Sequence, residues 1–230
     1  MTRTTVVAIA ALLLLAAQQG LEAHGVSGKD AVYLQGLSGQ AIVPLMYLGA
    51  KHMVTGYDHL LFLFGVIFFL YRLKDVLLYV SLFTLGHSAT LLLGVLGGIR
   101  ADAFIVDAII GFSVVYKAFE NMDGFRKFFG VEPSTRAAVL IFGLFHGFGL
   151  ATKLQEFELS PNGLVANIVS FNVGVEIGQG LALSAILIAL SYWRMHRSFV
   201  NHAFAANAIV MACGFLLVGY QLSGYVLEGQ

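Results

Sequence analysis

Residues 163–192 read GLVANIVSFNVGVEIGQGLALSAILIALSY, and Glu176 is their one charged residue. About 20 apolar residues in a helix suffice to cross a bilayer core of ~30 Å, so this run is more than long enough. Comparable apolar runs, separated by short charged breaks, fill the chain from residue 43 onward. Helices are expected, because backbone groups in lipid must be hydrogen-bonded within their own segment. We predict six spans, at residues 43–71, 75–98, 102–121, 136–154, 163–192 and 203–224.

The composition agrees with a membrane protein. The chain of 230 residues is 58% hydrophobic and 11% charged, whereas soluble domains carry roughly 25% charged residues to cover their surface. Thirteen basic residues balance thirteen acidic ones, which leaves no basic field for nucleic acid. The single Cys213 excludes a disulfide framework and a Cys-rich zinc site. The fold class predicted is an all-α integral membrane protein.

The N-terminal residues 1–23 have the features of a secretory signal peptide. Arg3 precedes an apolar core at residues 6–17 that is too short to span a bilayer. Ala23 is the expected last residue removed, although an uncleaved anchor is an alternative. Cleavage there exposes His24, whose amine and imidazole can chelate a metal outside the membrane. The other segments expected are a short extracytoplasmic stretch (24–42), a six-helix membrane domain (43–224) and a short C-terminal tail (225–230).

Basic residues are distributed unequally between the two sides of these spans. With residue 24 outside, the outer loops hold only Arg100 and Lys153, and Lys29 lies in the leading segment. The inner loops then hold Arg72, Lys74, Arg126, Lys127, Arg136, Arg194 and Arg197. This bias follows the positive-inside rule. We expect a multi-pass protein of a bacterial inner membrane, with its N-terminus outside.

Several ionisable residues interrupt the apolar runs, where each charged group costs roughly 2.5 kcal/mol or more. His52 and His59 lie two helical turns apart in the first run, on one face with Thr55 between them. Asp58 can ligate from the flank or hold an imidazole N–H in place. The first run exceeds the length of a span, so it must tilt, break or project, and Gly49 and Gly56 are candidate breaks.

The second, fourth and fifth runs each carry further polar groups at a similar depth. His87 and His146 lie in the second and fourth runs, and the small pair at 143 and 147 lets another helix approach beside His146. Asn172, Glu176 and Gln179 form one stripe of the fifth run. Asp107 is a lone acid in the third run, and its part in an ion path is left open.

Together these groups predict a metal site in the middle of the membrane. Neutral imidazoles suit nickel, cobalt, zinc, copper and iron ions, and carboxylates offset the charge of the ion. The predicted ligands are His52, Asp58, His59, His87, His146 and Glu176, with Thr55, Asn172 and Gln179 holding them by hydrogen bonds. The alternative is that each histidine bonds a neighbouring helix and serves packing alone.

The pattern H-x5-D-H at His52, Asp58 and His59, followed by LLFL, resembles the HupE/UreJ family of membrane proteins. The stretches FHGFGLA (145–151) and FNVGVEIGQ (171–179) add to the resemblance, which runs from about residue 45 to 220. It implies nickel or cobalt uptake across a bacterial inner membrane for enzymes such as hydrogenase or urease. It also implies a metal-handling role for His52, Asp58, His59, His146 and Glu176.

This chain departs from the usual family pattern at two places. Family members often have Pro after the first His, where this chain has Met53. They also often have a Glu soon after the His-Gly motif, and this Glu is absent here. These departures point to a divergent branch.

Three functions are compatible with the sequence. The first is a permease for a divalent transition metal (nickel, cobalt or zinc). It is expected to work without nucleotide hydrolysis, since the chain has no P-loop. The second is an intramembrane metal-dependent hydrolase that uses zinc, with Glu176 as the general base. The third is a non-catalytic accessory subunit that retains metal for a membrane complex. Expected partners are the metal ion and membrane lipid, with a partner subunit or a second copy of the chain left open.

Overall fold

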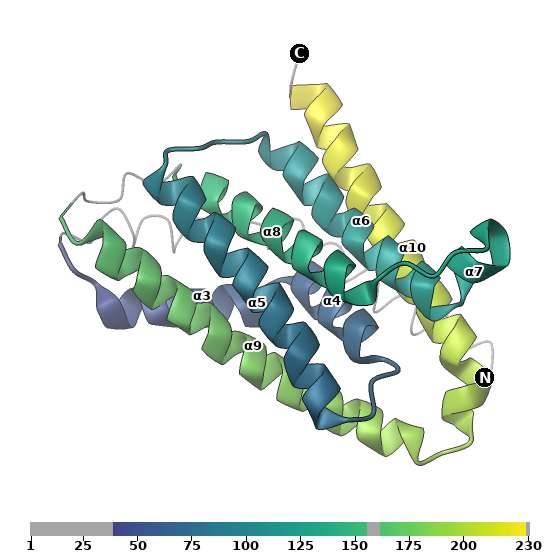
Figure 1. Cartoon of the computed structure of the whole chain (residues 1–230). Helices are drawn as coiled ribbons and strands as arrows, with labels where there is room; N and C mark the ends of the chain where they lie inside the picture. Colours follow the sequence, from purple (N-terminus) through teal and green to yellow (C-terminus); the bar gives the residue numbers. More distant parts are fainter. Residues whose placement is uncertain (1–38, 156–161, 229–230) are drawn as a thin grey trace, which may run out of the picture.

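The computed structural model describes residues 39–155 and 162–228, and all regular elements in these ranges are helices (Figure 1). The signal peptide at 1–23, His24 and most of the predicted stretch 24–42 lie outside the described residues. The helices are α3 (Ile42–Thr55), α4 (Tyr57–Ile67), α5 (Leu73–Leu96), α6 (Ala103–Asn121), α7 (Gly124–Phe129), α8 (Thr135–Leu154), α9 (Leu164–Arg194) and α10 (Ser198–Glu228). The last of these continues through most of the predicted C-terminal tail.

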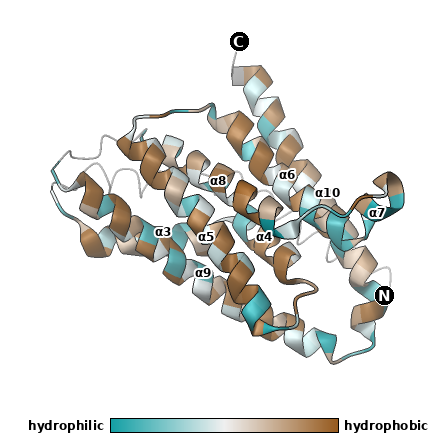
Figure 2. Ribbon diagram, viewed as in Figure 1, coloured by the Kyte–Doolittle hydropathy of each residue, from teal (hydrophilic) through white to brown (hydrophobic). Residues whose placement is uncertain are grey.

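Four of the described helices are long and apolar enough to cross a membrane: α5, α8, α9 and α10. Large apolar side chains are exposed over most helices, including Leu181 and Ile188 on α9, and hydrophobic residues are spread along all the long helices (Figure 2). Such broad apolar exposure is expected where lipid replaces water as the solvent. The six predicted spans stay predictions, because the first run is divided and α6 carries three charged residues, Asp107, Lys117 and Glu120. The signal peptide stays a prediction as well, because residues 1–23 lie outside the described residues.

The first predicted span is two helices rather than one, and its break lies at Gly56. This residue has φ −72° and ψ 106°, an extended conformation that ends α3 and begins α4. Its N–H donates to the carbonyl of His52 at 2.9 Å. Gly49, the other candidate break, lies inside α3. The shared face expected for His52 and His59 is therefore divided between two helices, and of the two candidate breaks the structure has the one at Gly56.

The long helices associate in three close pairs: α3 with α9, α5 with α8, and α6 with α10 (Figure 1). In the first pair, Gly49 faces the backbone of Phe171 and Gly174 faces the backbone of Met46. In the second pair, Gly143 faces Phe83 and Gly147 faces His87. Small residues allow such backbone-to-backbone packing, which drives helix association in lipid. The close approach expected beside His146 is thereby confirmed, and the partner is α5.

The short helix α4 lies among the long helices and contacts α3, α6, α9 and α10. Its apolar side chains, such as Phe62 and Ile67, are almost completely buried. Arg194 of α9 donates to the carbonyls of Ile67, Phe68 and Leu70 at 2.5, 2.6 and 2.9 Å. A cation at these carbonyls satisfies the C-terminal end of a helix. Arg194 thus holds the C-terminal end of α4 against α9.

Replacing Gly147 with alanine is expected to destabilise the α5–α8 pair. The added Cβ would overlap the carbonyl oxygen of His87, which as backbone has little room to move. Overpacking of this kind costs about 1–3 kcal/mol, and it should lower the midpoint of thermal unfolding in detergent. Gly180→Ala is the matched control, because a Cβ there meets no atom within 4 Å. Equal midpoints for the two variants would contradict the packing described.

Candidate metal centre

The break at Gly56 places Asp58 and His59 in the first turn of α4, deep in the bundle. Their exposed fractions are 4% and 3%. A carboxylate is favoured at this position, because the N-terminus of a helix carries a partial positive charge. Interrupted helices are a recurrent feature of ion and substrate sites in membrane transporters. The divided helix therefore supplies both a carboxylate and an imidazole at one point.

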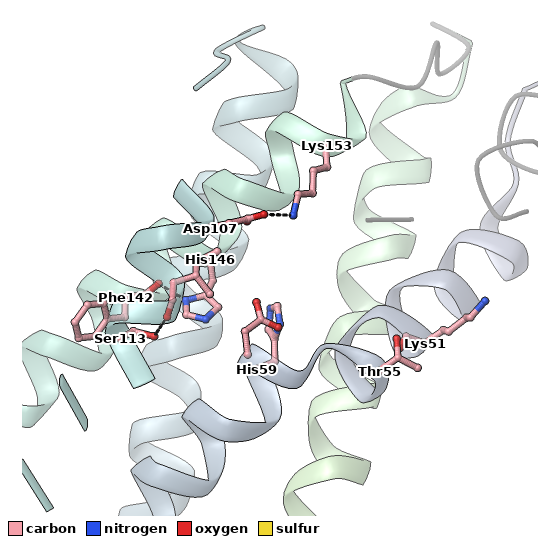
Figure 3. Close-up of polar contacts among 10 residues, drawn as sticks. Lys51, Thr55, His59, Asp107, Ser113, Phe142, His146 and Lys153 are labelled. Atoms are coloured by element: carbon pink, nitrogen blue, oxygen red, sulfur yellow. Dashed lines mark hydrogen bonds and ion pairs between the residues drawn. The ribbon is translucent and has the colours of Figure 1, made fainter. Parts of the chain in front are cut away.

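His59 lies at the centre of four imidazole rings contributed by four helices. Its ring centroid is 5.0 Å from that of His52 on α3 and 5.0 Å from that of His146 on α8. The ring of His87 on α5 lies 6.4 Å away. Figure 3 shows His59 and His146 facing one another from α4 and α8. The structure thus brings together all four histidines that the sequence placed at mid-membrane depth.

Hydrogen bonds orient two of these rings. The Nδ1 atom of His146 donates to the carbonyl of Phe142 at 2.7 Å, since a carbonyl only accepts (Figure 3). The Nδ1 atom of His59 lies 2.9 Å from Oδ1 of Asp58, and Nδ1 is the donor when that carboxyl group is ionised, because a carboxylate only accepts. In a neutral imidazole, donation from Nδ1 leaves the lone pair on Nε2. A carboxylate or carbonyl behind a histidine is the usual arrangement in protein metal sites.

The chemistry of the donor atoms fits a transition metal. One ligand atom each from Asp58, His59 and His146 lies within 4.8 Å of the others. Nε2 of His59 is buried without a hydrogen-bond partner among the described residues. A buried polar group left in this state costs about 1–3 kcal/mol. Coordination of a metal by imidazole nitrogen removes that cost, whereas packing alone does not.

A small cavity connects this cluster with a second polar group. His52, Asp58, His59 and His146 line it together with Ile110, Gly149, Leu150, Asp107 and Lys153. Nζ of Lys153 on α8 lies 2.6 Å from Oδ2 of Asp107 on α6 (Figure 3). The sequence placed Lys153 in an outer loop and left Asp107 open. Their pairing joins different helices, and the only sequence signal for it was an isolated acid in an apolar run.

None of the three predicted supporting residues lines the cavity. Thr55 is exposed on α3 and donates to the carbonyl of Lys51 at 2.8 Å (Figure 3). The two amides of α9 instead join it to α5: Ser88 bonds Asn172, and Thr84 donates to Gln179 at 2.9 Å. These contacts fix the helix that carries His87, so they support the site indirectly.

Glu176 is exposed on α9 and does not belong to the group formed by Asp58, His59 and His146. The neighbouring Val175 and Gly178 face the interior, whereas Glu176 and Ile177 face outward. The stripe with Asn172 and Gln179 therefore straddles the edge of the buried face. Its predicted roles as a ligand and as a general base stay predictions.

Apolar crossing helices around a buried His/Asp cluster define a multi-pass membrane protein with a candidate transition-metal site. Comparison with models of protein families matches residues 28–229 to the family described as HupE / UreJ protein. The chain belongs to the HupE/UreJ family, which is associated with nickel and cobalt transport. Comparisons with curated proteins and with solved structures found no match.

Proposed function

We propose that this protein is a permease for a divalent transition metal, nickel or cobalt, which is bound as cargo by the four-histidine cluster. The observation that carries the proposal is the position of His59, in ring contact with His52 and His146 and hydrogen-bonded to Asp58. Nitrogen ligands with one carboxylate suit these ions. Membership of the HupE/UreJ family supports the same choice of cargo.

The chemistry of this donor set suits transfer of an ion. Asp58, His59 and His146 hold the ion, and His52 and His87 lie next to them as alternative ligands. Replacement of one imidazole by a neighbouring one lets the ion move without complete rehydration. A transport site must bind well enough to strip water yet weakly enough to release the ion. Because only one carboxylate accompanies the neutral imidazoles, the electrostatic attraction between the site and the ion is limited, and the ion can be released.

We further propose that the protein lies in the bacterial inner membrane with its N-terminus outside. The support is the positive-inside distribution of charge: Arg72, Arg194 and Arg197 lie at one end of the apolar helices. A signal peptide at residues 1–23, six spans and a metal-binding His24 belong to the same proposal.

Flux measurements in proteoliposomes test the permease directly. We expect the purified full chain to pass Ni2+ or Co2+ down a concentration gradient into vesicles that contain a metal-sensitive dye, and Mg2+ to pass much more slowly. Mg2+ prefers oxygen ligands and loses its water reluctantly. Vesicles with the His146→Ala variant are the control. Metal binding without flux in any vesicle would overturn the permease and leave a metal-retaining protein.

A further inference from the structure

The ion pair of Asp107 and Lys153 lies in the cavity that leads to the histidine cluster, and no part of the proposed ligand set uses it. Lys153 is seven residues beyond His146, so it lies on the same face of α8, about 10 Å further along the helix axis. It belongs to the last turn of that helix, and Asp107 lies near the beginning of α6. The pair therefore occupies one end of the bundle, and the imidazoles lie deeper.

The exposed fractions of the two side chains place them in order along this path. The Lys153 side chain is 15% exposed and that of Asp107 is 6% exposed, whereas His146 is 1% exposed. An ammonium group on a long flexible stem can move outward toward the membrane surface while its helix stays in place. The carboxylate of Asp107, on a short side chain, cannot follow it.

We propose that Asp107 is the entrance ligand for the divalent cation and that Lys153 is a tethered cation which occupies this position until the ion arrives. The inference rests on the proposed function of the histidine cluster. When Lys153 swings outward, the ion takes its place beside Asp107 and then passes to His146 and His59. While Lys153 is paired, its ammonium group repels cations from the cavity and keeps the charge of Asp107 neutralised.

The charges of the two partners predict opposite effects on metal association. Lys153→Met leaves a carboxylate that attracts cations, and focused fields of this kind raise association rates by 10-fold or more. Asp107→Asn leaves an ammonium group, and the association rate should fall about tenfold for the same reason. In the double variant Asp107→Asn/Lys153→Met both charges are absent, and the rate should return toward that of the unmodified protein. A pair that serves only to join α6 to α8 would make both single variants change in the same direction.

The experiment is stopped-flow mixing of Ni2+ with the full chain in detergent, followed by competition with a metal-sensitive dye. The matched control is Lys117→Met, which breaks the 2.6 Å pair with Glu120 at the other end of α6, away from the cavity. Lys153→Arg keeps the charge and should keep the slow association, and Lys153→Gln, which also removes the charge, replaces Lys153→Met if that variant fails to fold. Association rates that change in opposite directions for the two single variants support Asp107 as the entrance ligand and Lys153 as the cation that occupies its position. Changes in one direction, or none, overturn this assignment while the metal stoichiometry stays intact. Absence of bound metal in the unmodified protein would overturn the proposed function instead.

Discussion

Replacing His59 with alanine is expected to lower the affinity of the purified protein for Ni2+ or Co2+ by at least about 100-fold. Loss of a group that only supports a ligand already costs 10–100-fold, and His59 is the central ring of the cluster. The variant leaves His52 and His146 without the imidazole that lies 5.0 Å from each. It also leaves Asp58 without the Nδ1–H that it accepts.

Metal analysis after size-exclusion chromatography, together with equilibrium titration, measures this effect. His202→Ala is the matched control, because His202 is exposed on α10 and its Nδ1 donates to the carbonyl of Ser198 at 2.8 Å. Both variants should elute as monodisperse protein. An unchanged number of bound ions in His59→Ala would refute the site, whereas a loss in both variants would point to non-specific effects.

Replacing Gly56 with alanine is expected to weaken metal binding by about tenfold or more without removing any ligand. A Cβ at Gly56 would lie 2.8 Å from Nδ1 of His59 and 3.0 Å from Oδ1 of Asp58. These contacts are closer than van der Waals distance, so the hydrogen-bonded pair must shift. Alanine also favours a helix over an extended backbone by about 1 kcal/mol relative to glycine. A more continuous helix would shift Asp58 and His59 relative to His52, and loss of supporting geometry costs 10–100-fold in metal affinity.

The same titration measures this variant beside Gly180→Ala, which adds an equal methyl group to an open position of α9. We expect Gly180→Ala to bind metal as the unmodified protein does. If Gly56→Ala retained full affinity, the break between α3 and α4 would not be what positions the ligands.

The fold class and most of the helix limits were predictable from the sequence, because a lipid environment restricts which backbone structures an apolar run can form. Apolar runs must be helices that satisfy their own backbone, so α5, α8 and α9 begin and end within a few residues of the predicted spans. The four histidines were also predictable as a group, because each is costly in an apolar run and all lie at one depth.

The details of the site were less predictable, because they depend on contacts between helices. The sequence predicted one span at residues 43–71 with two candidate breaks, and it could not decide between them. The extended residue Gly56 is the actual break, and it changes the direction of the helix that follows. Glu176 and Gln179 lie three residues apart, yet α5 covers only Gln179, through Thr84. The pairing of Asp107 with Lys153 spans 46 positions and two helices.

The order of residues along the chain thus determined a helical membrane protein of the HupE/UreJ family with imidazoles at mid-depth. Only the tertiary structure decided which groups meet: His59 at the centre, Asp58 beside it, and the Asp107–Lys153 pair in the same cavity. The physical reason is that hydropathy and helical period act within one segment, whereas coordination depends on how separate helices rotate and approach. Glycines 143 and 147 set that approach for α5 and α8.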